Sequence, residues 1–369
     1  MLSSPAIRPS LQKRLRPVLL GGTLLLVVLK IVALSPAPLE DSSASPRAID
    51  LDELVLKEQN TLAPGIPKGT VPDYTIDQFN YVSTHAGEKQ WNLLAQQAFF
   101  FNADKLVHAR IVKALLYDTE GKITVVTGLE SKYLMTQNDL EIFGDVQTRF
   151  PDGFLVKSDY MRYLTKKHRV EIPVSYPTEG DGVEQGGQKI HFDSHGLVYE
   201  MDKGEIYLSQ DVKFKVLENQ TTTLLVSDHA LIHRDRSIVD FMMAPQRPDK
   251  TRFVQIYQPT LYARGRTGKL KYGSGVNLLQ DMTLFDDVFV EEFTDKDGVR
   301  SISRYGTGGQ GDFDSRHNTV VLTIYPQVYQ DEDTLTGDKI TLHRESDIIE
   351  VEHSNGFSTG NDDDADSSP

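Results

Sequence analysis

Apolar and polar residues alternate with a period of two over most of residues 73–353, and this pattern restricts the chain to strands. Segments such as GKITVVTGL, HRVEIPVSYP and NTVVLTIYPQVYQ are rich in Val, Ile, Thr and Tyr, which strands prefer. Turn signals such as Pro151-Asp152-Gly153 separate the segments. EKQWNLLAQQAFFF (88–101) also fits a strand in this setting. The sequence therefore predicts an all-β fold.

A degenerate repeat runs through this region: a small or acidic residue, an apolar alternation, a charged turn and a second alternation. It recurs in residues 157–174, 193–214, 226–243 and 336–353. Each unit is a hairpin that cannot cover its own apolar face. Stacked antiparallel hairpins would enclose a continuous apolar interior, as in a β-jellyroll or half-pipe.

The candidates for this interior come mostly in pairs two residues apart, so that each pair shares one face of its strand. They are Leu140, Ile142, Phe154, Val156, Tyr163, Ile172, Val174, Leu197, Tyr199, Ile206 and Leu208. Tyr163 is out of step with Phe154 and Val156, and it points inward only if a bulge intervenes. For each single residue, an ordinary core role and a ligand-contacting role both stay open.

Residues 17–34, PVLLGGTLLLVVLKIVAL, would span about 27 Å as a helix, close to the thickness of a bilayer core. We predict an uncleaved transmembrane anchor over 17–35. Pro36 would hinder cleavage in the alternative case of a signal peptide. The preceding basic residues predict a cytoplasmic N-terminus over 1–16; they are Arg8, Lys13, Arg14 and Arg16.

The rest of the chain divides by composition. Residues 36–72 contain repeated Pro and Ser and predict a tether, with a short helix expected near 48–59. The expected β-rich modules are 73–219 and 220–354. The acidic segment 355–369 holds too few apolar residues to order itself.

Composition and motifs exclude several classes of function. A net charge of −14 argues against nucleic acid, and the absence of cysteine excludes disulfides and thiolate metal sites. GTGGQG (306–311) matches a dinucleotide motif, but an apolar strand pattern follows where a helix is required, so we expect a flexible loop. His191 and His195 would lie too far apart on a strand for a compact metal site. We expect no catalytic site, no cofactor and no metal.

Motifs in residues 73–217 resemble the LptC-type, membrane-anchored proteins of lipopolysaccharide export. The order of the parts matches: an N-terminal anchor, THAGEKQWNLLAQQAFFF, then NDLEIFGDV and SHGLVY. The repeats of the second half, above all TLTGDKITLHRESDIIEVEH, resemble the soluble bridge proteins of the LptA/OstA type. LptC-type proteins end soon after the first module, so the second module would be an extension.

The resemblance implies a non-enzymatic protein. Its family binds lipopolysaccharide and hands it from an inner-membrane ABC transporter across the periplasm toward the outer membrane, where a periplasmic bridge protein or an outer-membrane translocon receives it. Its location would be the inner membrane, single-pass, with the bulk of the chain in the periplasm. Two alternatives stay open: a membrane-tethered β-rich periplasmic scaffold without lipid cargo, and a glycan-acting enzyme using Asp and Glu.

The resemblance also assigns roles at two glycines and at the ends of the stack. Gly87 and Gly196 match family glycines, and we expect a role in structure or assembly. An open stack has two unpaired edges that invite another strand. We expect Tyr74 at the edge that meets the transporter, and the far edge to meet a partner through Ile348, Ile349 and Val351.

The anchor yields a topology prediction. The basic residues are expected to hold the N-terminus in the cytoplasm, which places the C-terminus in the periplasm. A periplasmic reporter enzyme fused after Pro369 should therefore be active, and a cytoplasmic reporter at the same position should not. Activity of a cytoplasmic reporter at the same position would contradict both the anchor and its orientation.

Overall fold

The computed structural model describes residues 71–182, 188–218, 221–244, 252–272, 279–296, 299–331, 333–344, 346 and 348–358. Contacts divide the chain into the units Met1–Ile49 and Asp50–Pro369, and every described residue belongs to the second. The predicted anchor, the short helix and all of the tether except residues 71 and 72 lie outside the described residues. Within the described ranges, no helix has the length and apolar character needed to cross a membrane.

The described residues form an all-β structure, as predicted, with two single-turn 3₁₀ helices, η1 (Thr165–Lys167) and η2 (Met201–Lys203). The first twelve strands are β1 (Tyr74–His85), β2 (Glu88–Phe101), β3 (Leu106–Tyr117), β4 (Ile123–Leu134), β5 (Asp139–Arg149), β6 (Leu155–Leu164), β7 (Arg169–Asp181), β8 (Gln188–Glu200), β9 (Glu205–Leu208), β10 (Val212–Glu218), β11 (Thr221–Ser227) and β12 (His229–His233). The other strands are β13 (Ile238–Met242), β14 (Val254–Gln258), β15 (Leu261–Gly265), β16 (Thr267–Tyr272), β17 (Leu279–Lys296), β18 (Val299–Asp314), β19 (Thr319–Thr323), β20 (Gln327–Gln330), β21 (Asp333–Thr336), β22 (Lys339–His343), β23 (Ile349–Glu352) and β24 (Asn355–Ser358).

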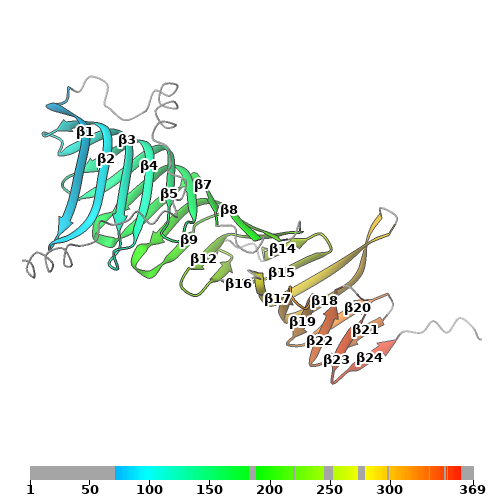
Figure 1. Ribbon diagram of the computed structural model, residues 1–369. Helices are drawn as coiled ribbons and strands as arrows, with labels where there is room; N and C mark the ends of the chain where they lie inside the picture. The colour runs from blue at the N-terminus through cyan, green and yellow to red at the C-terminus, as the bar shows by residue number, and fades with distance from the viewer. Residues whose placement is uncertain are drawn as a thin grey trace, which may run out of the picture. The chain divides into compact units, whose positions relative to one another are not determined.

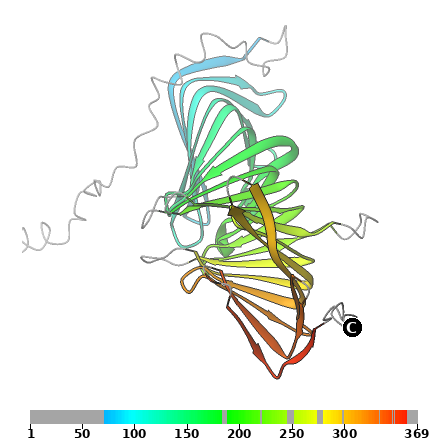
Figure 2. The same cartoon turned by 90° about the vertical axis from the view of Figure 1, so that its right-hand side faces the viewer.

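All strand pairs are antiparallel, and from β1 to β8 each strand pairs with the next one along the chain (Figure 1). After β8 the pairing divides into two ladders, because one part of β8 pairs with β10 and the other with β9. The first ladder continues through β11, β14, β15, β17, β18, β20, β21 and β24. The second continues through β12, β13, β16, β17, β18, β19, β22 and β23. Figure 2 shows these strands from the side.

A line of bulges connects the two ladders. The pairing of β5 with β6 shifts between Phe143 and Val146, where Gly144 and Asp145 have φ values of 71° and 44°. The pairing of β17 with β18 shifts between Phe285 and Val288 in the same way. A bulge bends its strand and re-aims the following side chains. Each long strand, or each pair of short strands, therefore contributes one part to each ladder.

The inward side chains of both ladders form one apolar core, which includes residues from Phe79 to Leu342. Contacts join the ladders across this core. Phe214 of the first ladder meets Phe241 of the second edge-to-face, with ring centroids 5.6 Å apart. Phe150 and Tyr199 meet similarly at 4.6 Å. Full burial of such a side chain contributes about 1.5–3 kcal/mol, so the stack is stabilised mainly by this shared core.

Three expectations about individual segments are wrong. The start of the acidic segment 355–369 does take up regular structure, because Asn355–Ser358 form β24 and pair with β21. GTGGQG is not a flexible loop, because Gly306, Gly308 and Gly311 lie within β18. A Cβ atom at Gly308 would lie 2.9 Å from the main-chain oxygen of Thr323 on β19, so glycine permits a close approach of neighbouring strands there. The inward orientation of Val174 is also wrong: its side chain is 53% exposed.

The glycines generate a stability prediction. Gly87 and Gly196 both have positive φ, but a Cβ atom would meet nothing within 4 Å at Gly87, whereas at Gly196 it would lie 2.9 Å from backbone atoms of Val174. Gly87→Ala should destabilise by about 1–2 kcal/mol through the left-handed backbone alone. Gly196→Ala should destabilise by about 2–5 kcal/mol, because steric overlap is added. Urea unfolding of both variants measures the difference, and equal losses would contradict the crowding at Gly196.

Candidate functional site

The structure brings ten of the eleven predicted interior residues together. The nine buried ones are Leu140, Ile142, Val156, Tyr163, Ile172, Leu197, Tyr199, Ile206 and Leu208. Phe154 is partly buried and packs against the same core. Val174 is the exception, because the pairing of β7 with β8 shifts between Ile172 and Pro177 and alternation past Ile172 no longer predicts the inward face. A contact between any of these residues and a ligand stays a prediction.

Tyr163 lies inward because the inward positions change parity along β6. Val156 and Met161 are both buried although they are five positions apart, and Tyr163 follows Met161 by two. The pairing of β6 with both of its neighbours shifts in this interval. The bulge that the sequence required for an inward Tyr163 is therefore present.

The interior is apolar and holds a few unpaired polar atoms. The Tyr163 hydroxyl and the Trp91 indole nitrogen are both buried without a hydrogen-bond partner. Burial raises the pKa of Tyr163, and Asp202 and Asp118 raise it further, so this phenol stays neutral at physiological pH. Burial also raises the pKa of Tyr199, against the opposing effect of Arg234. An uncharged, weakly polar interior suits a ligand with long apolar chains and a few acceptor oxygens.

Sequence reasoning missed the part of the interior that the second half of the chain supplies. Its largest side chains include Phe214, Phe241, Leu284, Leu322 and Leu342, all with at most 2% exposure. The signal was present for Phe241, Leu322 and Leu342, since each lies on a short strand with period-two burial. These residues belong to the same core cluster as Leu140 and Ile142, so the interior continues past β9.

A buried ion pair interrupts the apolar character of the interior in the second half. Arg304 of β18 is 4% exposed, and its Nε donates to Glu292 of β17 at 2.5 Å. Its NH2 group donates to the main-chain oxygen of His343 at 2.7 Å. A charge taken out of water needs such partners, and the loss of one partner is strongly destabilising. The inward face is therefore polar at this point.

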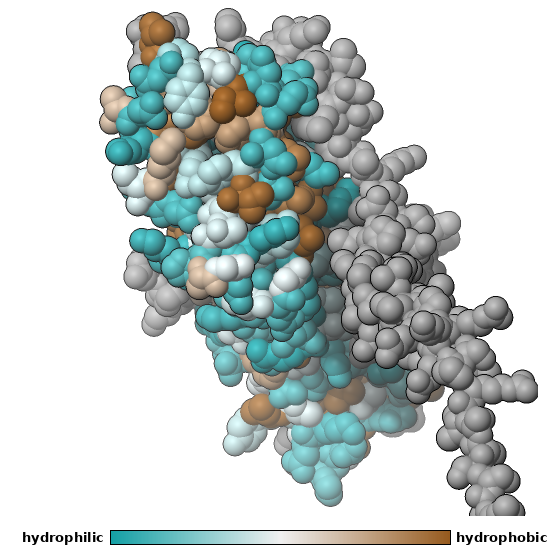
Figure 3. Space-filling model, turned by 60° about the vertical axis from the view of Figure 1, so that its left-hand side comes forward, coloured by the Kyte–Doolittle hydropathy of each residue, from teal (hydrophilic) through white to brown (hydrophobic). Residues whose placement is uncertain are grey.

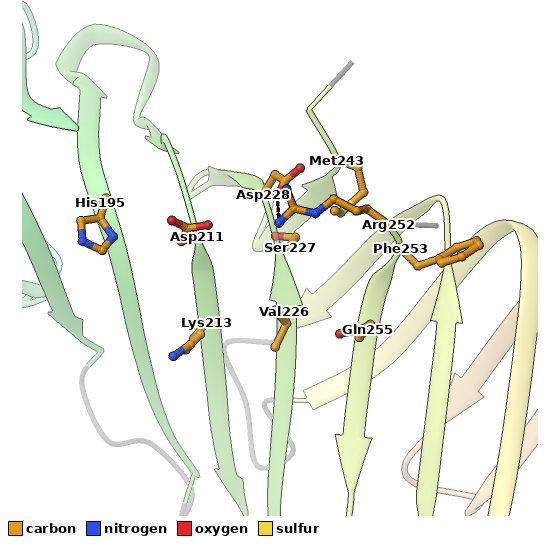
Figure 4. Close-up of a pocket in the computed structure, with 10 residues that line it drawn as sticks. All are labelled: His195, Asp211, Lys213, Val226, Ser227, Asp228, Met243, Arg252, Phe253 and Gln255. Atoms are coloured by element: carbon orange, nitrogen blue, oxygen red, sulfur yellow. Dashed lines mark ion pairs between the residues drawn. The ribbon is translucent and has the colours of Figure 1, made fainter. Parts of the chain in front are cut away.

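A pocket of about 500 Å³ lies outside the core, over β8, β10, β11 and β14 (Figure 4). Lys213, Val226 and Gln255 line it from outward strand positions, and the Arg252 guanidinium pairs with Asp228 at 3.0 Å. Its mixed charges distinguish it from the apolar interior. Within the described ranges, no group of three or more metal-ligating side chains is placed to hold a metal ion.

The predicted edge residues differ in exposure. Tyr74 lies on β1, is 46% exposed and stacks on Phe100 at 4.4 Å. Figure 3 views the side of the molecule that carries β1 and shows apolar side chains among polar ones. At the other end Ile348 is 57% exposed, whereas Ile349 and Val351 pack against the core. Tyr74 and Ile348 are thus accessible in this structure.

Comparison with known families assigns the first half of the fold. The family described as "Lipopolysaccharide-assembly, LptC-related" matches residues 54–216. The chain contains an LptC-related domain. This match confirms the resemblance seen in the sequence, and it begins earlier than the predicted module. The LptC-related family comprises non-enzymatic transport proteins, which agrees with the expectation that the chain is no enzyme.

Comparisons beyond the LptC-related domain add little. No curated protein matches the chain. One solved structure that is similar to part of the chain is LptH from Pseudomonas aeruginosa, described as the LptA-homologous periplasmic component of the lipopolysaccharide transport device. It is 14% identical, with a TM-score of 0.31, over 37% of this chain and 95% of LptH.

Proposed function

We propose that this chain binds lipopolysaccharide through its acyl chains and passes it from an inner-membrane ABC transporter toward the outer membrane. The observation that carries the proposal is the apolar core that runs through the LptC-related domain and continues to β22. An acyl chain of about a dozen carbons loses roughly 10 kcal/mol if it leaves an apolar environment for water, at about 0.8 kcal/mol per CH₂. Transfer across an aqueous compartment therefore requires an apolar surface along the whole route.

The two modules would share this task. Residues 73–219 would receive the lipid, and residues 220–354 would extend the route as a half-pipe of the bridge type. Hydrogen bonding supports this continuity, because β10 pairs with β11 across the expected boundary. The anchor over 17–35 would hold the chain in the inner membrane with its bulk in the periplasm.

A membrane-tethered scaffold without lipid cargo is the second candidate. The observation that favours it is the tight filling of the interior, where Leu140, Ile142 and Leu208 have no exposure at all. A scaffold needs only this packed core. Direct capture of lipid distinguishes the two candidates.

The first test uses a photo-crosslinking residue. Phe154→p-benzoylphenylalanine keeps an aromatic ring at a partly buried interior position, so irradiation in cells should capture lipopolysaccharide. The matched control is the same residue at Lys157, which is exposed on β6, three positions after Phe154. Capture at position 154 but not at 157 supports the proposal. Equal labelling at both positions, or none at 154, supports the scaffold instead.

A second test concerns the partners at the two edges. The same photoreactive residue at Tyr74 should capture the transporter, and at Ile349 or the more exposed Ile348 it should capture another β-rich protein of the pathway. An unpaired strand offers main-chain groups to a partner strand, which gives the physical basis of both contacts. Capture of the same partner from both edges would contradict a directional transfer.

A further inference from the structure

The turns that join the strands fall into two rows, because successive strands run in opposite directions. We call the row that includes the β3–β4, β5–β6 and β14–β15 turns the first rim. The row that includes the β4–β5, β6–β7, β8–β9, β12–β13 and β22–β23 turns is the second rim. The first rim lies at the strand ends of the first ladder that face away from the line of bulges. The second rim lies at the corresponding strand ends of the second ladder. The line of bulges lies between them.

Side chains near the two rims contact each other at five places, one of which is the hydrogen bond from the Arg304 guanidinium to the main-chain oxygen of His343 described above. Asn138, in the β4–β5 turn of the second rim, donates from Nδ2 to Gln90 Oε1 at 3.0 Å. Gln90 lies in the β1–β2 hairpin, on the side of the first rim. The Thr119 hydroxyl donates to Asp202 Oδ1 at 3.1 Å. The remaining two contacts are the ion pair of Arg234 NH2 with Asp152 Oδ2 at 2.7 Å and the hydrogen bond of Arg344 NH2 to Thr260 Oγ1 at 3.0 Å. Together these contacts form a seam along the stack.

The seam is built differently from the rims that it joins. Neighbouring turns of the second rim share main-chain hydrogen bonds, such as Met201 N to His168 O at 3.0 Å and Arg234 N to Gly204 O at 3.2 Å. Among the main-chain hydrogen bonds between described residues, none links the first rim to the second. The exposed pairs, Thr119 with Asp202 and Arg344 with Thr260, contribute about 0–1 kcal/mol each. The seam is therefore formed only by contacts that involve side chains, whereas the described residues along the line of bulges connect the two ladders through the main chain.

The charged side chains of Asp202 and Arg234 stabilise the closed seam. Hydrogen bonds from His168 and Thr119 lower the pKa of Asp202 against the opposing effect of burial, so that its carboxylate stays charged and accepts from the other rim. Arg234 also donates to the Tyr199 hydroxyl at 2.8 Å and lies over the Phe150 ring at 5.3 Å. It thereby covers two aromatic rings that face each other across the core.

We propose that this seam opens to admit the acyl chain of a lipid, while the line of bulges acts as the hinge. The proposal rests on the function proposed above, because only a cargo that occupies the interior requires an opening. Leu140, Ile142 and Leu208 have no exposed surface, so an acyl chain cannot reach these three residues with the seam closed. Separation of the rims breaks the side-chain contacts of the seam and core contacts beside it, such as Phe150 with Tyr199, but it leaves the strand pairing within both ladders intact.

The test locks the seam covalently. The chain has no cysteine, so Thr119→Cys with Asp202→Cys introduces a single pair of thiols whose parent side chains are in contact. The pair is placed in the full chain that carries Phe154→p-benzoylphenylalanine and is bridged by oxidation or by a short bifunctional thiol reagent. Lipopolysaccharide capture should fall at least tenfold in the bridged form and return on reduction.

A matched control bridges two strands within one ladder. Lys157 and Glu179 are exposed cross-strand partners on β6 and β7, so Lys157→Cys with Glu179→Cys adds a crosslink without spanning the seam. Its capture should not change on oxidation. If the first pair disturbs folding, which urea unfolding would reveal, Asp152→Cys with Arg234→Cys locks the seam at another contact.

The outcomes separate the two proposals. Full capture by a bridged seam pair would overturn the opening of the seam and leave lipid binding intact. Absence of capture by the reduced pair and by the cysteine-free chain would overturn lipid binding itself. A loss in the bridged seam pair and in the control pair alike would also count against the seam, because rigidity in general would then be the cause.

Discussion

A hairpin with one apolar face is the constraint on which the rest of this structure depends. No single hairpin can bury that face, so each one is stable only against its neighbours. The line of bulges solves the remaining problem, because it bends every strand so that the apolar faces of both ladders point at each other. One cluster of buried side chains results, and contacts such as Phe214 with Phe241 join its two sides. Stability and a continuous apolar interior thus have the same origin.

Much of this fold could be predicted from alternation alone. The strand over 88–101 and the hairpins of the repeat are present, because period-two patterns report which face is buried. Prediction failed where the alternation is interrupted. Val174 follows a register shift that the sequence does not announce, and GTGGQG looks like a loop although glycine there serves close strand packing. The inward orientation of Tyr163 could be predicted only on the condition of a bulge, because it depends on the register shifts between β6 and its two neighbouring strands.

The seam could not be predicted from the sequence. Thr119 and Asp202 are 83 residues apart, and Asp152 and Arg234 are 82 residues apart. Their contacts depend on how many strands lie between two turns and on how sharply each strand bends. Neither quantity leaves a local pattern. The LptC-related domain was recognisable for the opposite reason, because its short motifs occur in a fixed order along the chain.

The division into two ladders has a consequence for recognition at the far end of the stack. Among the described strands, β23 pairs only with β22 and β24 only with β21, so each ladder finishes in a short edge of its own. A partner that continues both edges must carry a bend at the same place as this chain, with matching registers on either side. A flat strand could satisfy only one edge. The bend therefore restricts which proteins can pair with both edges. Each added protein with the same bend would present two edges of the same geometry to the next protein.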